Sequence, residues 1–145
     1  MAWSWFCGHC VAPPPHCIPA PHQRLCASCG VGLVQQARAD LAPTPGDAFL
    51  IVDSTLRVQA VSEAAQALLT VSEEQAVGYQ VTELLLPADV EAVGASVLAE
   101  AITRAAGADD ARATAFVRPG MTFGLRLRAR IVACGPPRAA LIAFQ

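Results

Sequence analysis

Four cysteines near the start of the chain are the residues best suited to chemistry, because they form two Cys-x-x-Cys pairs. Cys7-Gly-His-Cys10 and Cys26-Ala-Ser-Cys29 stand fifteen residues apart. Two residues between thiolates allow a tight turn that points both sulfur atoms at one ion, and a second pair completes a closed tetrahedron. The spacing therefore predicts a structural Zn²⁺ site that holds the fold together, with the ligands Cys7, Cys10, Cys26 and Cys29.

Neighbouring residues leave other ligand sets open. The residues close enough in sequence to replace one of the four cysteines are Cys17, His9, His16 and His22. In a zinc knuckle, backbone N–H groups turn toward the sulfur atom, and the glycine after Cys29 suits that turn. The valine after Cys10 suits it less well. We therefore expect the second pair to form the more regular knuckle.

The overall composition favours a cytoplasmic location without a membrane partner. The 145 residues carry a formal net charge of −2, and 15% of them are charged. We find no positively charged leader, and every apolar run is interrupted well before the ~18 residues that a membrane-spanning helix needs. In a reducing compartment the cysteines stay free to bind metal instead of forming disulfides.

Composition also divides the chain into two parts. Residues 1–30 hold all three histidines and five of the six cysteines but few aliphatic residues, so this part needs a metal as a staple. Trp3, Trp5 and Phe6 are expected to pack beneath the metal. A short helix is expected within 31–41, ended by Ala-Pro-Thr-Pro-Gly. The predicted parts are a zinc-ribbon-like module at 1–41, a linker at 42–46 and a second domain at 47–145.

The second domain alternates strand and helix patterns. Two short strands at 48–53 and 56–61 form a hairpin, after which Ser62 caps a short helix that ends at Leu69. Ser72 and Gln75 form a capping box for the next helix. The other expected elements are a brief turn at 81–86, a long helix from Pro87 to about Ala106 followed by a left-handed Gly107, and strands at 111–118, 122–133 and 138–145.

Charge is distributed unevenly along the chain. Residues 40–110 contain all twelve acidic residues and two arginines, whereas 111–145 contain six arginines and no acidic residue. In the middle strand, one face carries Arg126, Arg128 and Arg130, and the other carries Phe123, Leu125, Leu127, Ala129 and Ile131. The arginine face is a candidate surface for an acidic partner or a second copy of the chain, and the alternative is that it only solvates the strand.

The order of these elements resembles the PAS family of sensor domains over about residues 46–145. The similarity is most specific in Phe49-Leu-Ile-Val-Asp53, in Val61-Ser-Glu-Ala-Ala65 with Leu68-Leu69, in Val77-Gly78 and in Leu84-Leu85-Leu86-Pro87. The family often has glycine where Thr70 stands. The resemblance implies an α+β fold with a five-stranded antiparallel sheet, helices on one face and an enclosed cavity for a small ligand.

The resemblance also allows the cofactors of the family to be compared with this sequence. Haem-binding members use a histidine on or near the long helix, and no histidine follows His22. Flavin photoreceptors use a cysteine before that helix, and Cys134 is the only cysteine after Cys29. We therefore expect neither cofactor. The interior holds an uncharged ligand or, as we favour, is filled by its own side chains, and its candidate lining is Leu85, Val93, Val97, Leu127 and Ile131.

Together these features predict a cytoplasmic regulatory protein with a zinc module and a PAS-like sensory or dimerisation domain. It is expected to form a homodimer or to act on a separate signalling protein, with transcription regulation as one setting. No Ser/His/Asp set, P-loop or Gly-x-Gly-x-x-Gly motif is present, so we do not expect an enzyme. Two other hypotheses stay open: a zinc-dependent transcription regulator that binds nucleic acid, and a redox sensor built on zinc thiolates.

Overall fold

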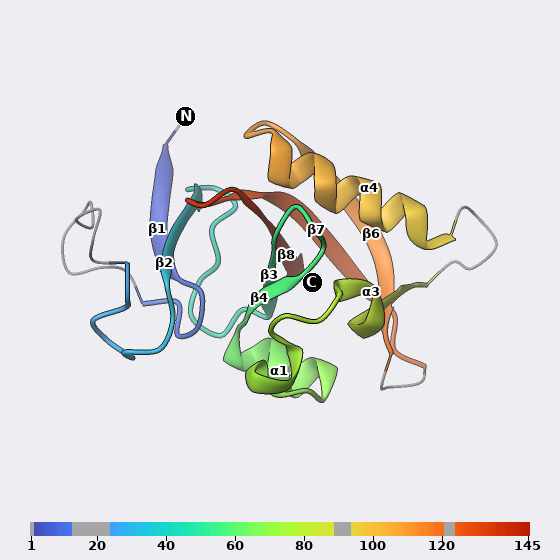
Figure 1. The fold of residues 1–145 in the computed structure, drawn as a ribbon, viewed down its shortest axis with the longest axis horizontal. Coiled ribbons are helices and arrows are strands. Elements are labelled where there is room, and N and C mark those ends of the chain that lie inside the picture. The colour runs from blue at the N-terminus through green and yellow to red at the C-terminus, as the bar shows by residue number, and fades with distance from the viewer. Residues whose placement is uncertain (1, 13–23, 89–93, 121–123) are drawn as a thin grey trace.

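The computed structural model describes residues 2–12, 24–88, 94–120 and 124–145, which form a six-stranded sheet, a two-stranded sheet and four helices (Figure 1). The strands are β1 (Trp3–Cys7), β2 (Val34–Arg38), β3 (Phe49–Val52), β4 (Val58–Val61), β5 (Leu85–Pro87), β6 (Arg112–Pro119), β7 (Leu127–Cys134) and β8 (Ala139–Phe144). The helices are α1 (Glu63–Leu69), α2 (Glu73–Ala76), α3 (Val81–Leu84) and α4 (Gly94–Gly107).

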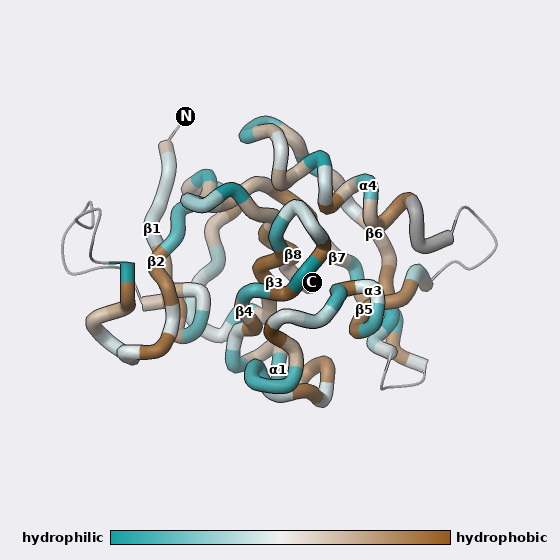
Figure 2. The backbone as a smooth tube through the Cα atoms, viewed as in Figure 1, coloured by the Kyte–Doolittle hydropathy of each residue, from teal (hydrophilic) through white to brown (hydrophobic). Residues whose placement is uncertain are grey.

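The large sheet is antiparallel and has the strand order β4-β3-β8-β7-β6-β5, so the last strand of the chain lies inside it. β8 pairs with β3 on one side and β7 on the other, and Ile142 lies opposite Leu50 and Ile131. Figure 2 shows that the central strands are hydrophobic. Because side chains alternate between the faces of a strand, the sheet has an inner face toward the helices and an outer face.

The inner face carries the main hydrophobic core. α4 lies across it and buries Leu98, Ile102 and Ala105, which recur at helical spacing. The three short helices bury Ala65 and Leu69 of α1, Ala76 of α2 and Val81 of α3 in the same core. Among the described residues, no helix is long and apolar enough to cross a bilayer.

Local capping signals set the first helices in place, as the sequence predicts. Ser62 Oγ accepts a hydrogen bond from Ala65 N at 3.2 Å, which caps α1, and another from Phe49 N at 2.9 Å, which ties the cap to β3. The capping box of Ser72 and Gln75 is present at the start of α2. Thr70 ends α1 with a left-handed φ of 56°, at the position where the resemblance expects glycine.

The β1–β2 pair packs on one half of the outer face. Phe6 is 2% exposed and meets Phe49 edge-on, with ring centroids 5.8 Å apart. Gln36 of β2 exchanges backbone hydrogen bonds of 2.6 and 3.0 Å with Gly135, which follows β7. We call the shared core the outer cluster; its buried members are Phe6, Val11, Ala37, Leu41, Phe49, Ile51, Val132, Cys134, Ala139, Leu141 and Ala143.

The prediction of a short helix within 31–41 is wrong, because strand β2 occupies that segment. β2 pairs antiparallel with β1, from Trp3 opposite Arg38 to Cys7 opposite Val34. Pairing with a strand at the start of the chain overrides the local helix propensity of the segment. Phe6 also differs from the expectation, since it packs on the sheet and not beneath the metal site.

Several other boundaries differ from the expectation. The sheet has six strands and not five, because Leu85–Pro87 pairs with the end of β6. β7 begins at Leu127, since Gly124 turns the chain with φ of +79°, and Phe123 lies outside the described residues. Gly107 is the last residue of α4 and is not left-handed. The long helix does not begin at Pro87 as expected, because Pro87 pairs with Val117 as the last residue of β5; the described part of the helix begins at Gly94, and residues 89–93 lie outside the described residues.

Candidate metal centre

The four cysteines of the two pairs come together in space. Their Sγ atoms all lie within 4.8 Å of one another, with Cys7 and Cys26 buried and Cys10 and Cys29 half-buried. Two sulfur pairs join the motifs, Cys7 with Cys29 at 3.7 Å and Cys10 with Cys26 at 3.7 Å. A tetrahedral Zn²⁺ with bonds of about 2.3 Å places its sulfur ligands about 3.8 Å apart. The donor set therefore fits a closed metal site with four thiolate ligands.

Backbone N–H groups point at the sulfur atoms of both pairs. His9 N and Cys10 N donate to Cys7 Sγ at 3.3 and 3.4 Å. In the second pair, Ser28 N donates to Cys26 Sγ at 3.3 Å, and Gly32 N donates to Cys29 Sγ at 3.4 Å. Such donors stabilise thiolate charge, which a metal-binding knuckle requires.

The two knuckles have matching turns, although the sequence predicts that the second is the more regular one. Gly30, after Cys29, has a φ of 68°, and Val11, after Cys10, has a φ of 69°. A β-branched residue in this left-handed region costs about 1–2 kcal/mol, so the surrounding structure must hold Val11 there. Val11 is 7% exposed and belongs to the outer cluster, which supplies that packing.

Gly32 allows the second knuckle to approach the first. A Cβ atom added at Gly32 would overlap Cys7 Sγ and lie 2.7 Å from His9 Cβ and 2.9 Å from His9 N. A side chain there would therefore push the two knuckles apart. The role of Gly32 could not be predicted from the sequence, because the contact joins two loops that are separate in the chain.

The thiols of the centre differ in acidity. Burial raises the pKa of Cys7 to about 12 and also raises the pKa of Cys10. Burial acts in the same direction on Cys29, but hydrogen bonds from the N–H groups of Gly32 and Val31 and from neighbouring thiols outweigh it and lower its pKa to about 6. Metal binding must therefore displace protons from Cys7 and Cys10 at neutral pH.

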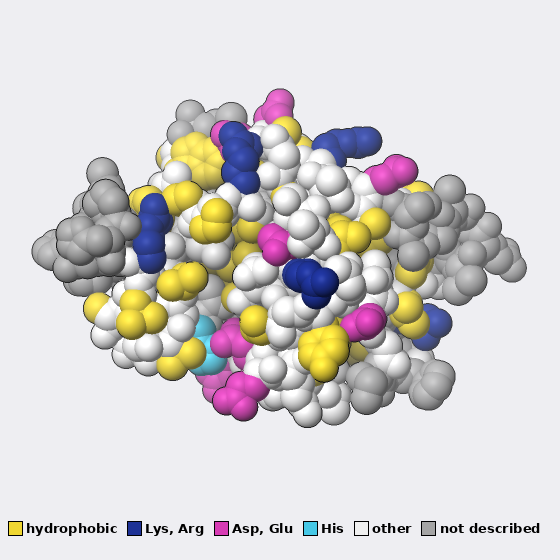
Figure 3. All heavy atoms as spheres, in the orientation of Figure 1, with side chains coloured by type: hydrophobic (Ala, Val, Ile, Leu, Met, Phe, Trp, Pro, Cys, Tyr) yellow, Lys and Arg dark blue, Asp and Glu magenta, His cyan; other side chains and the backbone are white. Residues whose placement is uncertain are grey.

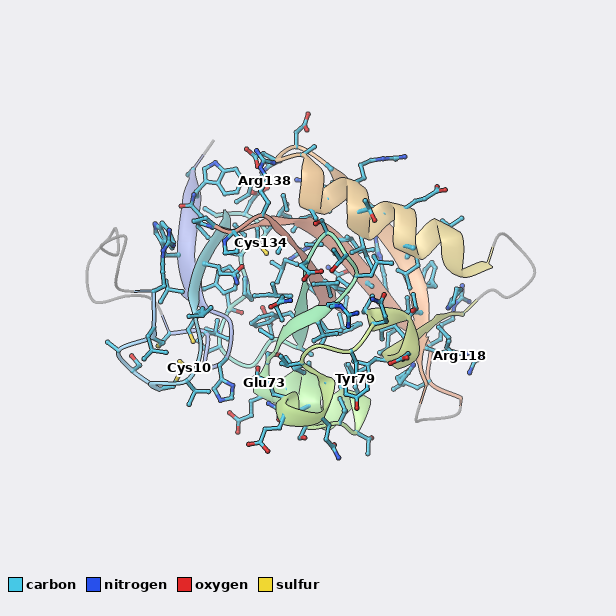
Figure 4. The ribbon with its side chains drawn as sticks, in the orientation of Figure 1. Cys10, Glu73, Tyr79, Arg118, Cys134 and Arg138 are labelled. Atoms are coloured by element: carbon cyan, nitrogen blue, oxygen red, sulfur yellow. The ribbon has the colours of Figure 1, made fainter. Side chains whose placement is uncertain are left out.

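A contact that the sequence does not indicate links the metal centre to α2. His9 Nδ1 lies 3.1 Å from Glu73 Oε1, and Glu73 Oε2 accepts a hydrogen bond from Val61 N at 2.8 Å. His9 is thus engaged with a carboxylate, which favours the four cysteines as the ligand set. Figure 4 shows Cys10 and Glu73 on the same side of the molecule. The other substitutes named above, Cys17, His16 and His22, lie outside the described residues.

No family model and no curated protein matches the sequence. A PAS domain of a protein from Colwellia psychrerythraea matches with a TM-score of 0.53 and 19% identity, over 69% of this chain and 85% of that chain. The PAS domain of nitrogen regulation protein NR(II) from Vibrio parahaemolyticus matches with 0.48 and 17%, over 69% and 88%. A PAS domain from a two-component sensor histidine kinase matches with 0.49 and 9%, over 70% and 86%.

The six-stranded sheet and its helices have the PAS fold. This confirms the α+β, PAS-like fold expected from the sequence. At these identities the likeness concerns the fold alone.

The PAS interior contains three of the five residues expected to line it. Leu85, Leu127 and Ile131 are buried in the inner core. Val97 is 46% exposed, so its placement in the interior is wrong, because the turn of α4 directs Leu98 inward instead. Val93 lies outside the described residues.

A groove of about 580 Å³ lies between the four-cysteine segment and the part of the chain that has the PAS fold. Val31 and Leu33 of the module line it, as does Val77 after α2, and these side chains are 62%, 52% and 42% exposed. His9 and Glu73 also line the groove. In Figure 3, acidic side chains lie next to the histidine. The groove could not be predicted from the sequence because its walls come from distant segments.

The predicted arginine face is divided by the structure. Arg128 and Arg130 lie on the outer face of β7, whereas Arg126 precedes that strand. The Arg126 guanidinium lies 4.2 Å from the centre of the Phe116 ring. Arg130 Nη2 donates to Leu41 O at 3.0 Å, which ties this arginine to the end of the metal module.

Proposed function

We propose that the chain is a regulatory protein in which a zinc module covers part of the outer face of a PAS domain that acts on a separate protein partner. The observation that carries the proposal is the outer cluster, because residues of both parts are buried in it. Phe6 directly precedes Cys7 and packs against Phe49 of the sheet. Order at the metal site and cover of the PAS sheet therefore depend on each other.

Zinc is the metal that fits the centre best. Soft thiolate ligands in a small closed set favour Zn²⁺ over hard cations, which prefer oxygen. Once bound, the ion would fix the geometry of both knuckles and leave no coordination position for a substrate. The chain's own residues then do the rest, since N–H groups such as His9 N and Gly32 N hold the thiolates in place.

The proposal includes a cytoplasmic location and assigns no catalytic step to this chain. Free thiols persist in a reducing compartment, which suits the four-cysteine cluster. Regulation of transcription, through a homodimer or another signalling protein, is the setting that we propose. A ligand in the PAS interior is not part of the proposal, which treats Leu85, Leu127 and Ile131 as core residues.

Native mass spectrometry with metal analysis of the freshly purified chain tests this proposal. We expect one zinc ion per chain, and Cys26→Ser should remove it, whereas Cys134→Ser, which changes a buried cysteine outside the centre, should keep it. The same spectrum reports the oligomeric state and any retained organic molecule. A chain without metal, or one that keeps its metal in Cys26→Ser, would contradict the zinc module.

A redox sensor is a second candidate, favoured by the two 3.7 Å separations between sulfur atoms of different pairs. Cys7 and Cys29 would form one disulfide, and Cys10 and Cys26 another. For each disulfide, one hydrogen peroxide takes up two electrons and two protons and gives two water molecules. The reaction would expel the metal. A thiol count together with a zinc-release assay during peroxide titration distinguishes the candidates, since a purely structural site keeps both its thiols and its zinc at low peroxide.

A further inference from the structure

The half of the outer face that the metal module leaves uncovered carries an exposed aromatic ring among arginines. Phe116 of β6 is 44% exposed. Arg128 is its cross-strand neighbour on β7, and the Arg126 guanidinium lies 4.2 Å from the centre of its ring. Arg118 lies two residues further along the same strand and shares its face. We call Phe116, Arg118, Arg126 and Arg128 the basic surface.

The basic surface borders the metal module but is not covered by it. Arg130 and Arg112 mark the border, because Arg130 binds Leu41 O and Arg112 Nη2 lies 3.7 Å from Asp40 Oδ2. Residues 111–145, which supply every arginine of the basic surface, contain no acidic residue. Figure 4 places Arg118 at the opposite end of the molecule from Cys10.

We propose that the basic surface docks an acidic segment of a separate partner protein. Arginines and aromatic rings are the side chains enriched at the centres of protein interfaces. A guanidinium group binds a carboxylate through two parallel hydrogen bonds, and Phe116 supplies apolar area between such groups. The inference rests on the proposed function, since it names the surface through which the chain meets its partner.

A second copy of the chain fits this surface less well than a separate partner. The exposed acids Glu63, Glu74 and Glu83 lie on α1, α2 and α3, which pack on the inner face. The basic surface lies on the outer face. Contacts between the two surfaces of different copies would be head-to-tail, which builds rings or open chains and not a two-fold dimer.

Nucleic acid also fits less well. Single-stranded nucleic acid is held by several aromatic platforms along a positive groove, and Phe116 is the only aromatic side chain that the described residues expose on this half of the sheet.

Fluorescence anisotropy with two labelled twelve-residue peptides, one alternating Glu and Leu and one alternating Lys and Leu, tests the docking surface. We expect the full chain to bind the Glu peptide and not the Lys peptide, with weaker binding as salt rises. Arg128→Glu should weaken binding at least about tenfold, and Phe116→Ala by several-fold. Arg104→Glu, the same charge change at an exposed position of α4, is the matched control and should bind like the wild type.

Three results would overturn the inference. Equal losses in Arg104→Glu and Arg128→Glu would show that binding follows net charge and not this surface. Tighter binding of a labelled oligothymidylate than of the Glu peptide, lost in Arg128→Glu, would assign the surface to nucleic acid. Self-association in sedimentation, lost in Arg128→Glu, would assign it to a second copy.

Zinc content and thermal unfolding of every variant separate this inference from the proposed function. Phe116 and Arg128 are exposed, so both variants should fold and hold zinc. A wild-type chain that holds zinc but binds no Glu peptide contradicts the docking surface alone. A chain without zinc contradicts the proposed function, whatever the peptide does.

Discussion

The inner and outer faces of the PAS sheet are covered in different ways. The inner face is covered by four helices over a large apolar core, in which residues such as Leu50, Ile102 and Ile131 are completely buried. The outer face is half covered by a module whose own buried cluster consists of Cys7, Cys26 and Val34. The inner face is covered by hydrophobic burial alone, whereas the module on the outer face combines a four-cysteine cluster with packing against the sheet.

The comparison shows how a small module can fold without a core of its own size. Segments of about 40 residues bury too little apolar surface to be stable alone and need a metal, a disulfide or a partner surface. Here the structure offers two of these, the four cysteines and the outer cluster. The inner core should therefore survive changes that dismantle the module, and changes in the outer cluster should affect both parts.

Cys26→Ser should have the largest effect, because it removes a ligand from the metal centre. Structural zinc in such small sites contributes about 10 kcal/mol to folding, so the module should lose its order. The proposed division into 1–41, 42–46 and 47–145 predicts that the PAS core stays folded. Limited proteolysis with mass spectrometry should find cuts before residue 42 and protection beyond it. Equal digestion of both parts would contradict the division.

Phe6→Ala tests the link between the metal module and the outer face of the sheet. Removing this buried ring should cost about 3–5 kcal/mol of unfolding free energy and also weaken zinc binding, since Phe6 adjoins Cys7. Ile102→Ala in the inner core should cost about 2–5 kcal/mol and leave zinc affinity unchanged while the protein is folded. Denaturant unfolding and competition with a zinc chelator measure the two quantities. If Phe6→Ala leaves zinc affinity at the wild-type value, zinc binding by the module does not depend on packing against the sheet.

Gly32→Ala and Gly30→Ala form a matched pair within the second knuckle. A methyl group at Gly32 would collide with Cys7 and His9, so we expect a loss of about 1–3 kcal/mol, seen mainly as weaker zinc binding. At Gly30 nothing lies within 4 Å, and the cost is the left-handed φ alone, about 1 kcal/mol. In a chelator titration, Gly32→Ala should bind zinc more weakly than Gly30→Ala. The opposite order of zinc affinities would refute close contact between the knuckles.

Asp53 provides the smallest effect and a pH dependence. Burial raises its pKa, but hydrogen bonds from Thr55, Arg57 and Gln59 outweigh burial and lower the pKa below 3.8. A depressed pKa in the folded state stabilises the fold above the unfolded pKa of about 3.9, and this stability is lost as pH falls through the folded pKa. Asp53→Asn should cost about 1 kcal/mol at neutral pH in urea unfolding, and less as the pH falls below about 4. The same cost at both pH values would contradict the role of the carboxylate.

The sequence predicts those parts of the molecule that rest on neighbours in the chain. The spacing of Cys7 and Cys10, and of Cys26 and Cys29, is local, and so are the caps at Ser62 and Ser72. The hairpin of β3 and β4 follows from two alternating segments around a turn. These features carry enough information to indicate both the metal cluster and the PAS fold.

The remaining features depend on contacts between distant segments. β2 is a strand because β1 pairs with it, and Phe6 is buried because Phe49 lies opposite. The contact of His9 with Glu73 joins residues 64 positions apart. Val97 illustrates the same limit on a smaller scale, since helical spacing alone does not say whether Val97 or Leu98 faces the core.

Hydrogen exchange with and without a zinc chelator tests the central claim most directly, that a metal holds the module on the outer face of the PAS sheet. We predict that removing the metal abolishes protection of amides in β1 and β2, while amides in β7 and α4 keep most of theirs. Unchanged protection of β1 and β2 after metal removal would contradict the claim.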